Sequence, residues 1–145
     1  MSISASLDVS IASKSGNSLT SSEIIGVLVM NGWKIRNENK IFYLPLGDDD
    51  SFNWQEDDIS EYEFYEIAKQ KEFGNEIVGV AMVWENSNIG GTILIYPDGK
   101  FSFSFSVNLK KTDKLTTDVN WYMERILPCF ESSVTTVENF SFTQA

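Results

Sequence analysis

The sequence predicts an α+β fold, with a mainly antiparallel sheet of about six to seven strands and three helices in a single domain over residues 1–145. Three observations support this class. Several segments alternate apolar and polar residues, which is typical of half-buried strands. Others have helical spacing or begin with capping signals. Short turns join successive strands, so these strands should run antiparallel, with helices on one face or at the edges of the sheet.

The first strand and the first helix have the clearest patterns. From Ile3 to Ile11, apolar residues alternate with serines and Asp8, which predicts a half-buried strand. Residues 20–23 read Thr-Ser-Ser-Glu and match a capping box, so a helix should begin there and run to about Met30. The following Asn-Gly pair provides a left-handed stop.

The middle of the chain predicts two short strands, at 33–36 and 41–44, and then an acidic loop at 48–58. A second capping box at 60–63 begins a helix that should continue to about residue 72 and end at Gly74. Its acidic first turn also suits the positive end of the helix dipole.

The last half of the chain is mostly strand. Residues 76–84 are apolar on both faces, as in a central strand, and strands are also expected at 92–96, 101–107 and 134–142. In the segment 101–107, three phenylalanines and a valine alternate with three serines. Leu115, Val119, Tyr122 and Ile126 have helical spacing and predict a helix over 115–127, which Pro128 should end or kink.

The charge of the chain restricts its partners. The formal net charge is −10 and the isoelectric point is near 4.3. Nucleic acid and anionic membranes would be repelled, so a basic protein is the favoured partner. The sequence has neither a secretory signal pattern nor an apolar run long enough for a membrane span. Together with a single cysteine, Cys129, this predicts a protein of the reducing cytoplasm.

Catalytic chemistry has little support in the residue inventory. There is no histidine, which removes the Ser–His and Cys–His nucleophile systems and the commonest zinc ligand. Cys129 has no activating base nearby in sequence. Asp57-Asp58 could act as an acid–base pair and residues 48–53 offer oxygens to calcium, but Phe52 and Asn53 break the EF-hand pattern. We therefore expect no enzyme activity, no cofactor and no metal.

The candidate binding site is the acidic stretch. Residues 41–68 contain nine acids and no base. Two aromatic side chains within it are suited to anchor a partner, while like charges around them would speed its approach. The alternative is that these aromatics pin a solvated loop to the core. The predicted contact residues are Asp48, Asp49, Asp50, Phe52, Trp54, Glu56, Asp57, Asp58 and Glu61.

A small, histidine-free, acidic α+β domain with the turn Asn31-Gly32-Trp33 and this acid–aromatic loop resembles the immunity proteins of bacterial polymorphic toxin systems, especially those of contact-dependent growth inhibition. The resemblance implies a cytoplasmic antidote that binds one cognate toxin domain, often a basic nuclease. The full set of helix caps and strands predicts a chain that folds without a ligand, as a monomer or weak dimer. The alternative is a small acidic secretion chaperone for an effector protein, although those begin with a helix.

Overall fold

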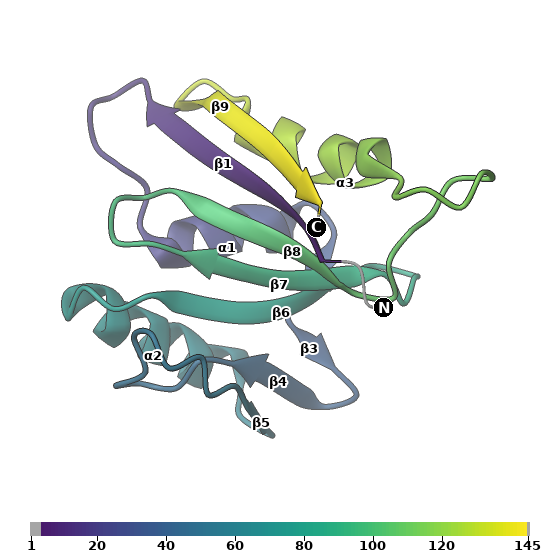
Figure 1. The fold of residues 1–145 in the computed structure, drawn as a ribbon. Helices are drawn as coiled ribbons and strands as arrows, with labels where there is room; N and C mark the ends of the chain where they lie inside the picture. The colour runs from purple at the N-terminus through teal and green to yellow at the C-terminus, as the bar shows by residue number, and fades with distance from the viewer. Residues whose placement is uncertain (1–3, 145) are drawn as a thin grey trace.

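The computed structural model describes residues 4–144 and has one nine-stranded sheet with helices packed against it (Figure 1). The predicted α+β class and the three helices are confirmed. The strands are β1 (Ala5–Ser13), β2 (Trp33–Lys34), β3 (Arg36–Asn37), β4 (Lys40–Tyr43), β5 (Gln55–Asp57), β6 (Val78–Trp84), β7 (Gly90–Ile95), β8 (Phe101–Val107) and β9 (Thr135–Gln144). The helices are α1 (Ser21–Met30), α2 (Glu61–Phe73), α3 (Val119–Ile126) and the 3-10 turn η1 (Leu127–Phe130).

The strand pairings are antiparallel, and the main path through the sheet is β3-β4-β6-β7-β8-β1-β9. The short strand β2 pairs with β6, and β5 pairs with β4. The sheet therefore ends in β9 on one side and in β5 on the other, as Figure 1 shows. The short strands β2 and β3 also pair with one strand each, β6 and β4.

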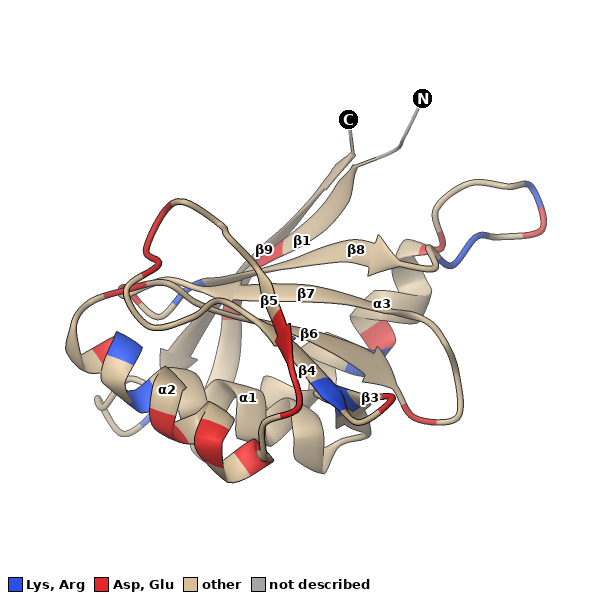
Figure 2. Ribbon diagram, turned by 90° about the horizontal axis from the view of Figure 1, so that it is seen from below, with Lys and Arg blue, Asp and Glu red and all other residues tan. Residues whose placement is uncertain are grey.

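The core lies between the helices and one face of the sheet. In β8, Phe101, Phe103 and Phe105 are buried, while the serines between them point to the opposite face. Leu7 of β1 lies opposite Phe103 in the register and is also fully buried. Figure 2 shows α1 and α2 together on one side of the central strands, which leaves the serine side of the sheet without a helix.

In the part of the core next to α3, Trp33 packs against several aromatic rings. It is 1% exposed, its ring lies 5.3 Å from Trp84 and 5.1 Å from Phe103, and its Nε1 donates to the Arg125 carbonyl at 2.9 Å. Gly32, at φ +118°, precedes it, and a Cβ there would lie 2.7 Å from the Trp84 ring. The Asn-Gly-Trp turn therefore brings a large side chain into the core at the end of α1.

The first predicted elements are largely confirmed. β1 begins at Ala5 and extends to Ser13, beyond the predicted end, while Ile3 lies outside the described residues. The capping box of α1 is complete, with Thr20 and Glu23 bonded in both directions. At α2 the box is only half formed. The Ser60 hydroxyl accepts the Glu63 N–H, but the Glu63 carboxylate contacts the Ser60 hydroxyl rather than its backbone N–H.

The predicted helix at 115–127 starts too early. α3 begins at Val119, because the Asp118 side chain accepts the Trp121 N–H and caps the helix there. Leu115 is 77% exposed at φ +63° and lies in the preceding loop, so its helical spacing was coincidental. At the other end Pro128 lies in η1, where the helix was expected to end. No helix in the described part of the chain is long and apolar enough to cross a membrane.

Candidate protein-binding surface

The acidic stretch is not one loop, as the sequence suggested, because it contains the edge strand β5. Gln55, Glu56 and Asp57 pair with Tyr43, Phe42 and Ile41 of β4, respectively. The strand was missed because its residues are all polar, and an edge strand with few buried side chains has no apolar alternation to reveal it. Charged residues on an edge also discourage unwanted strand pairing, so part of the acidity has a structural explanation.

The stretch also has a compensating base, which comes from α2. The side chain of Lys71 is 1% exposed, and its Nζ donates to the carbonyls of Pro45 at 2.7 Å and Asp48 at 2.6 Å and to Glu76 Oε1 at 3.1 Å. A buried ammonium is stable only when its donors are satisfied, and here three acceptors surround it. Residues 41–68 contain no base, but Lys71 lies just beyond them and compensates part of their charge in the folded protein.

Asp48 and Asp49 fix the same loop from within. Both oxygens of the buried Asp48 carboxylate accept backbone N–H groups, from Ser51 at 3.1 Å, Phe52 at 3.0 Å and Asn53 at 2.6 Å. Asp49 Oδ1 accepts the Ile77 N–H at 2.9 Å and ties the loop to the strand that follows α2. These two carboxylates organise the chain around them, whereas Asp50 is exposed.

The two aromatic residues of the stretch have different environments. The Trp54 ring is half-buried and stacks on Phe42, with centroids 5.1 Å apart and planes 9° from parallel. It also covers Gly79, where an added Cβ would lie 2.9 Å from the ring. Phe52 is 43% exposed at φ +51°, held there by the turn around Asp48. The packing of Trp54 favours the alternative in which it pins the segment to the sheet, and leaves Phe52 as the accessible aromatic.

Three acids around β5 contact neighbouring side chains. Tyr43 donates its hydroxyl to Asp57 Oδ2 at 2.8 Å, and burial, this hydrogen bond and the nearby negative charges raise the pKa of Tyr43 to about 12. Arg36 lies 3.3 Å from Asp58, whose side chain remains 77% exposed, and Lys40 lies 4.0 Å from Glu56. Exposed pairs of this kind contribute little to stability, so the acids are still available to a partner.

We use the name acidic surface for the exposed carboxylates of β5, of the residue after it and of the start of α2. In Figure 2 the red segments of β5 and of the neighbouring part of α2 lie on the same side of the molecule. The predicted contact residues therefore fall into two groups, one near each end of α2, about 20 Å apart for thirteen residues of helix. Sequence reasoning included Glu61 but left out Glu63. The acidic surface comprises Glu56, Asp57, Asp58, Glu61 and Glu63.

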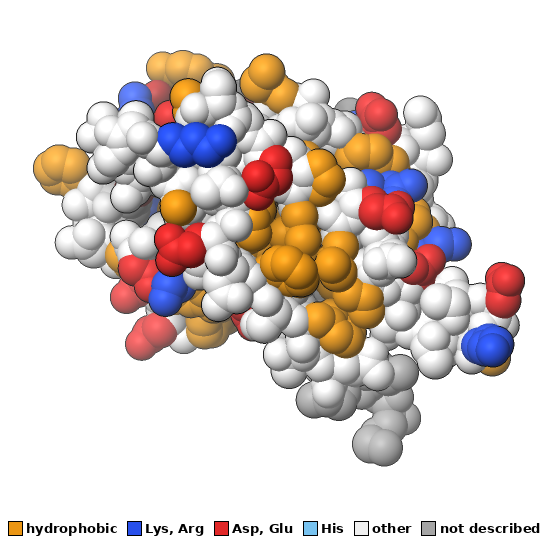
Figure 3. All heavy atoms as spheres, turned by 90° about the horizontal axis from the view of Figure 1, so that it is seen from above, with side chains coloured by type: hydrophobic (Ala, Val, Ile, Leu, Met, Phe, Trp, Pro, Cys, Tyr) orange, Lys and Arg blue, Asp and Glu red, His pale blue; other side chains and the backbone are white. Residues whose placement is uncertain are grey.

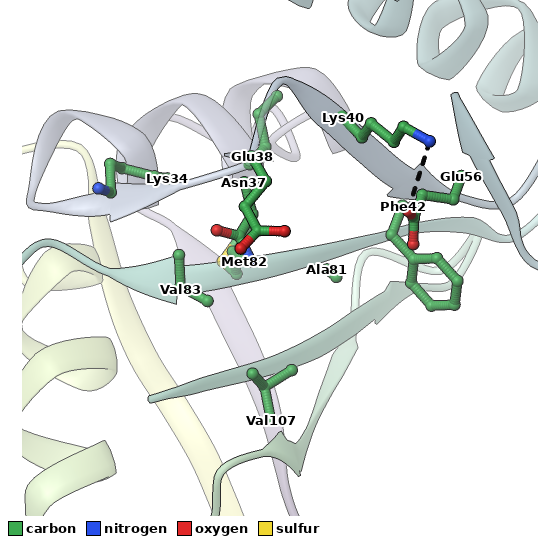
Figure 4. Close-up of a pocket in the computed structure, with 11 residues that line it drawn as sticks. Lys34, Asn37, Glu38, Lys40, Phe42, Glu56, Ala81, Met82, Val83 and Val107 are labelled. Carbon is green, nitrogen blue, oxygen red and sulfur yellow. Dashed lines mark ion pairs between the residues drawn. The ribbon is translucent and has the colours of Figure 1, made fainter. Parts of the chain in front are cut away.

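A groove of about 410 Å³ borders this surface at Glu56 (Figure 4). Its floor is apolar, with Phe42, Ala81 and Val83, and its rim carries Lys34, Glu38 and Lys40 in addition to Glu56. The hairpin formed by β3 and β4 and the neighbouring strand β6 hold most of these side chains, while Lys34 comes from β2 and Glu56 from β5. The groove could hold a long side chain with an apolar stem and a charged tip. No pattern in the sequence predicts this groove, because its lining residues are scattered from 34 to 107.

Asp57, Asp58 and Cys129, the candidates for reactive chemistry, each have a different hydrogen-bond partner. Asp57 and Asp58 turn to different partners, Tyr43 and Arg36, and do not form a carboxylate pair. Burial raises the pKa of the Cys129 thiol, which donates to the Arg125 carbonyl at 3.3 Å. Within residues 4–144, no cluster of three or more Asp, Glu, His or Cys side chains is placed to hold a metal ion.

Comparisons of the chain with protein-family models, with curated proteins and with solved structures gave no match.

Proposed function

We propose that this chain is a non-catalytic binding protein of the immunity type, which neutralises a cognate basic toxin domain through the acidic surface. The observation that carries the proposal is the clustering of five exposed carboxylates along β5 and the start of α2. Two bases, Arg36 and Lys40, contact them through partly exposed pairs. A surface of this charge attracts a basic partner over long range.

The mechanism would be occlusion. A nuclease domain needs a basic surface where it meets phosphates, and an acidic protein that occupies this place excludes the substrate by sterics and by charge. Carboxylates around the contact raise the association rate, while a few desolvated anchors slow dissociation. The groove beside Glu56 could receive one long side chain of the partner, and the exposed ring of Phe52 could fill a pocket on it.

Within residues 4–144 no reactive group is organised for catalysis, which supports a binding role over an enzymatic one. The thiol of Cys129 is half-buried with a raised pKa, which disfavours the nucleophilic thiolate. The acids of β5 are exposed to water and lie outside any enclosed site that could hold a substrate between them. The secretion chaperone named above would need a long apolar groove for an unfolded segment, and the groove described here has charged residues along its rim.

Co-expression tests this function. The domain encoded beside this chain's gene would be induced in cells with and without the chain, and growth would be recorded. The chain should restore growth, and a variant with Glu56→Gln, Glu61→Gln and Glu63→Gln should restore it less. Equal toxicity with and without the wild-type chain, when both proteins are shown to be folded and expressed, would contradict the immunity function. Protection of an unfolded effector segment against aggregation would instead support the chaperone.

A further inference from the structure

The outer edge of β9 has no strand beside it in the described residues, and side chains from other segments contact the strand near each end. Its inner edge pairs with β1 along its length, and no other strand of residues 4–144 lies on the outer side. At one end Glu131 Oε1 accepts the Val137 N–H at 2.7 Å. At the other end Thr117 donates its hydroxyl to the Gln144 side chain at 2.5 Å. Between them, residues 139–143 present an unpaired strand edge, which is a template for a further strand.

This open window exposes two aromatic rings. Phe140 is 45% exposed and Phe142 is 37% exposed, and both lie on the helix side of the sheet, opposite Val9 and Leu7. The groove next to Phe140, about 450 Å³ in volume, has Leu127 and Pro128 in its other wall. Figure 3 looks onto the side of the molecule with β9 and α3, and hydrophobic atoms gather at its centre. The opposite edge, β5, carries two acids in three residues, so β9 is the less protected edge.

We propose that the open window of β9 binds the same window of a second copy of this chain, with antiparallel strands and a twofold axis through Ser141. In this register Phe140 lies opposite Phe142 of the second copy, and the reverse pair forms as well. Asn139 then faces Thr143. Glu138, at the end of the window, would face Gln144 rather than another acid. Cross-strand aromatic pairs stabilise a sheet, and like charges directly opposite destabilise it.

Other registers match less well. An axis through Phe140 would place Glu138 opposite Phe142, and an axis through Phe142 would keep only one aromatic pair. An axis between Phe140 and Ser141 would set Phe140 opposite Ser141 and Phe142 opposite Asn139, and would turn the helices of the two copies to opposite faces. With the axis at Ser141, both copies have their helices on one face, and the α3–η1 segments flank the four rings. The sequence of the window is therefore self-complementary about Ser141.

The charge distribution permits this dimer without using the acidic surface. Because β5 and β9 are opposite edges of the sheet, the acidic surfaces of the two copies would point away from each other (Figure 1). The net charge of −10 on each copy still opposes association at long range. Added salt should therefore strengthen the dimer by screening this repulsion, whereas it should weaken binding of a basic partner. The opposite salt dependence separates this proposal from the proposed function.

Cysteine cross-linking tests the register. In a Cys129→Ser background, Ser141→Cys places two thiols directly opposite each other, with Cα atoms about 4.5–5.5 Å apart, within the range of a disulfide. Thr143→Cys is the matched control on the same edge. Its counterpart would lie four residues away along the strand, about 14 Å, and should not react. With oxidised glutathione, Ser141→Cys should become a covalent dimer and Thr143→Cys should remain single. Equal cross-linking of the two variants would overturn the register.

Sedimentation equilibrium tests association itself. At ~1 mM protein, where even weak binding is populated, the wild type should approach twice the 16.4 kDa mass of one chain, more fully at ~1 M than at ~0.1 M salt. Phe140→Lys should raise the dimer dissociation constant on the order of 30-fold. Phe73→Lys, at a ring 93% exposed on α2, is the control and should leave it unchanged. A single-chain mass under all conditions would overturn the proposal, as would equal effects of the two lysines. A variant without the acidic-surface carboxylates should still dimerise.

Discussion

The Nζ of Lys71 lies 2.6 Å from the backbone carbonyl of Asp48, so the most acidic part of the chain is built around a buried base. The lysine comes from α2, and its other acceptors are the Pro45 carbonyl and the Glu76 carboxylate. It joins the end of the helix to the acidic turn and to the segment that enters β6. The turn at 48–53 is therefore a packed, hydrogen-bonded structure, and its acids have unequal roles.

Replacing Lys71 should destabilise the protein strongly. Lys71→Met removes the donor and leaves two carbonyls and a carboxylate without their partner, so the free energy of unfolding should fall by about 3 kcal/mol. The control is Lys69→Met, an exposed lysine on the same helix, which should change it by no more than about 0.5 kcal/mol. Urea unfolding at neutral pH measures both. Equal stabilities of the two variants would show that Lys71 does not hold the turn.

Truncation of Trp54 should mainly lower the stability of the protein, whereas truncation of Phe52 should mainly weaken binding of a partner. Trp54→Ala removes the stack on Phe42 and opens space over Gly79, and should lower the free energy of unfolding by about 2 kcal/mol. Phe52→Ala removes a ring that is 43% exposed and should lower it much less. If Phe52 anchors a partner, its removal should raise the dissociation rate by about 30-fold. Thermal melts and dissociation kinetics, measured on both variants, decide the two roles. A Trp54→Ala protein of unchanged stability would contradict the role of Trp54 in holding the segment on the sheet.

Ionisation of the Tyr43 phenol should lower the stability of the protein in strong alkali. Its pKa is about 12 in the folded protein against 10 in an unfolded chain, so the neutral phenol is favoured by folding. This contribution is fully present below pH 10 and is lost as the pH rises from 10 to 12. At pH 11.5 the loss should be about 2 kcal/mol for this group. Urea unfolding at pH 9 and pH 11.5 should therefore show a smaller loss for Tyr43→Phe than for the wild type. Identical losses would contradict the assignment.

The sequence predicted the elements whose side chains alternate between core and solvent. β1, β8 and α1 have strong periodicity or complete caps, and the structure has them nearly as expected. β5 could not be predicted in this way, because an all-polar edge strand has no buried face. The start of α3 was predicted four residues too early, because Leu115 has helical spacing relative to Val119. Spacing alone does not show that the Asp118 side chain caps the helix and sets its first residue. Hydrogen-bond partners 14 to 92 residues apart, such as Tyr43–Asp57 and Trp33–Arg125, have no local signal.

The role of Lys71 did have a signal. Phe64, Ala68 and Lys71 have the spacing of one helix face, and the first two are buried, so the lysine lies where an apolar residue would be expected. A base at such a position predicts buried acceptors nearby. The acidic turn supplies them, which is why counting charges along the chain overstated how much of the stretch faces a partner.

The central claim is that the acidic surface steers a basic partner, and the association rate at low salt tests it most directly. The variant Glu56→Gln, Glu61→Gln, Glu63→Gln avoids Asp48 and Asp49, whose loss would disturb the fold. Its control is Asp8→Asn, Asp113→Asn, Glu124→Gln, which removes the same charge at exposed positions outside the acidic surface. Stopped-flow mixing with the toxin domain should show association about 10-fold slower for the first variant at ~0.01 M salt, with the difference vanishing near ~1 M. Equal association rates of the two variants at low salt would contradict the account.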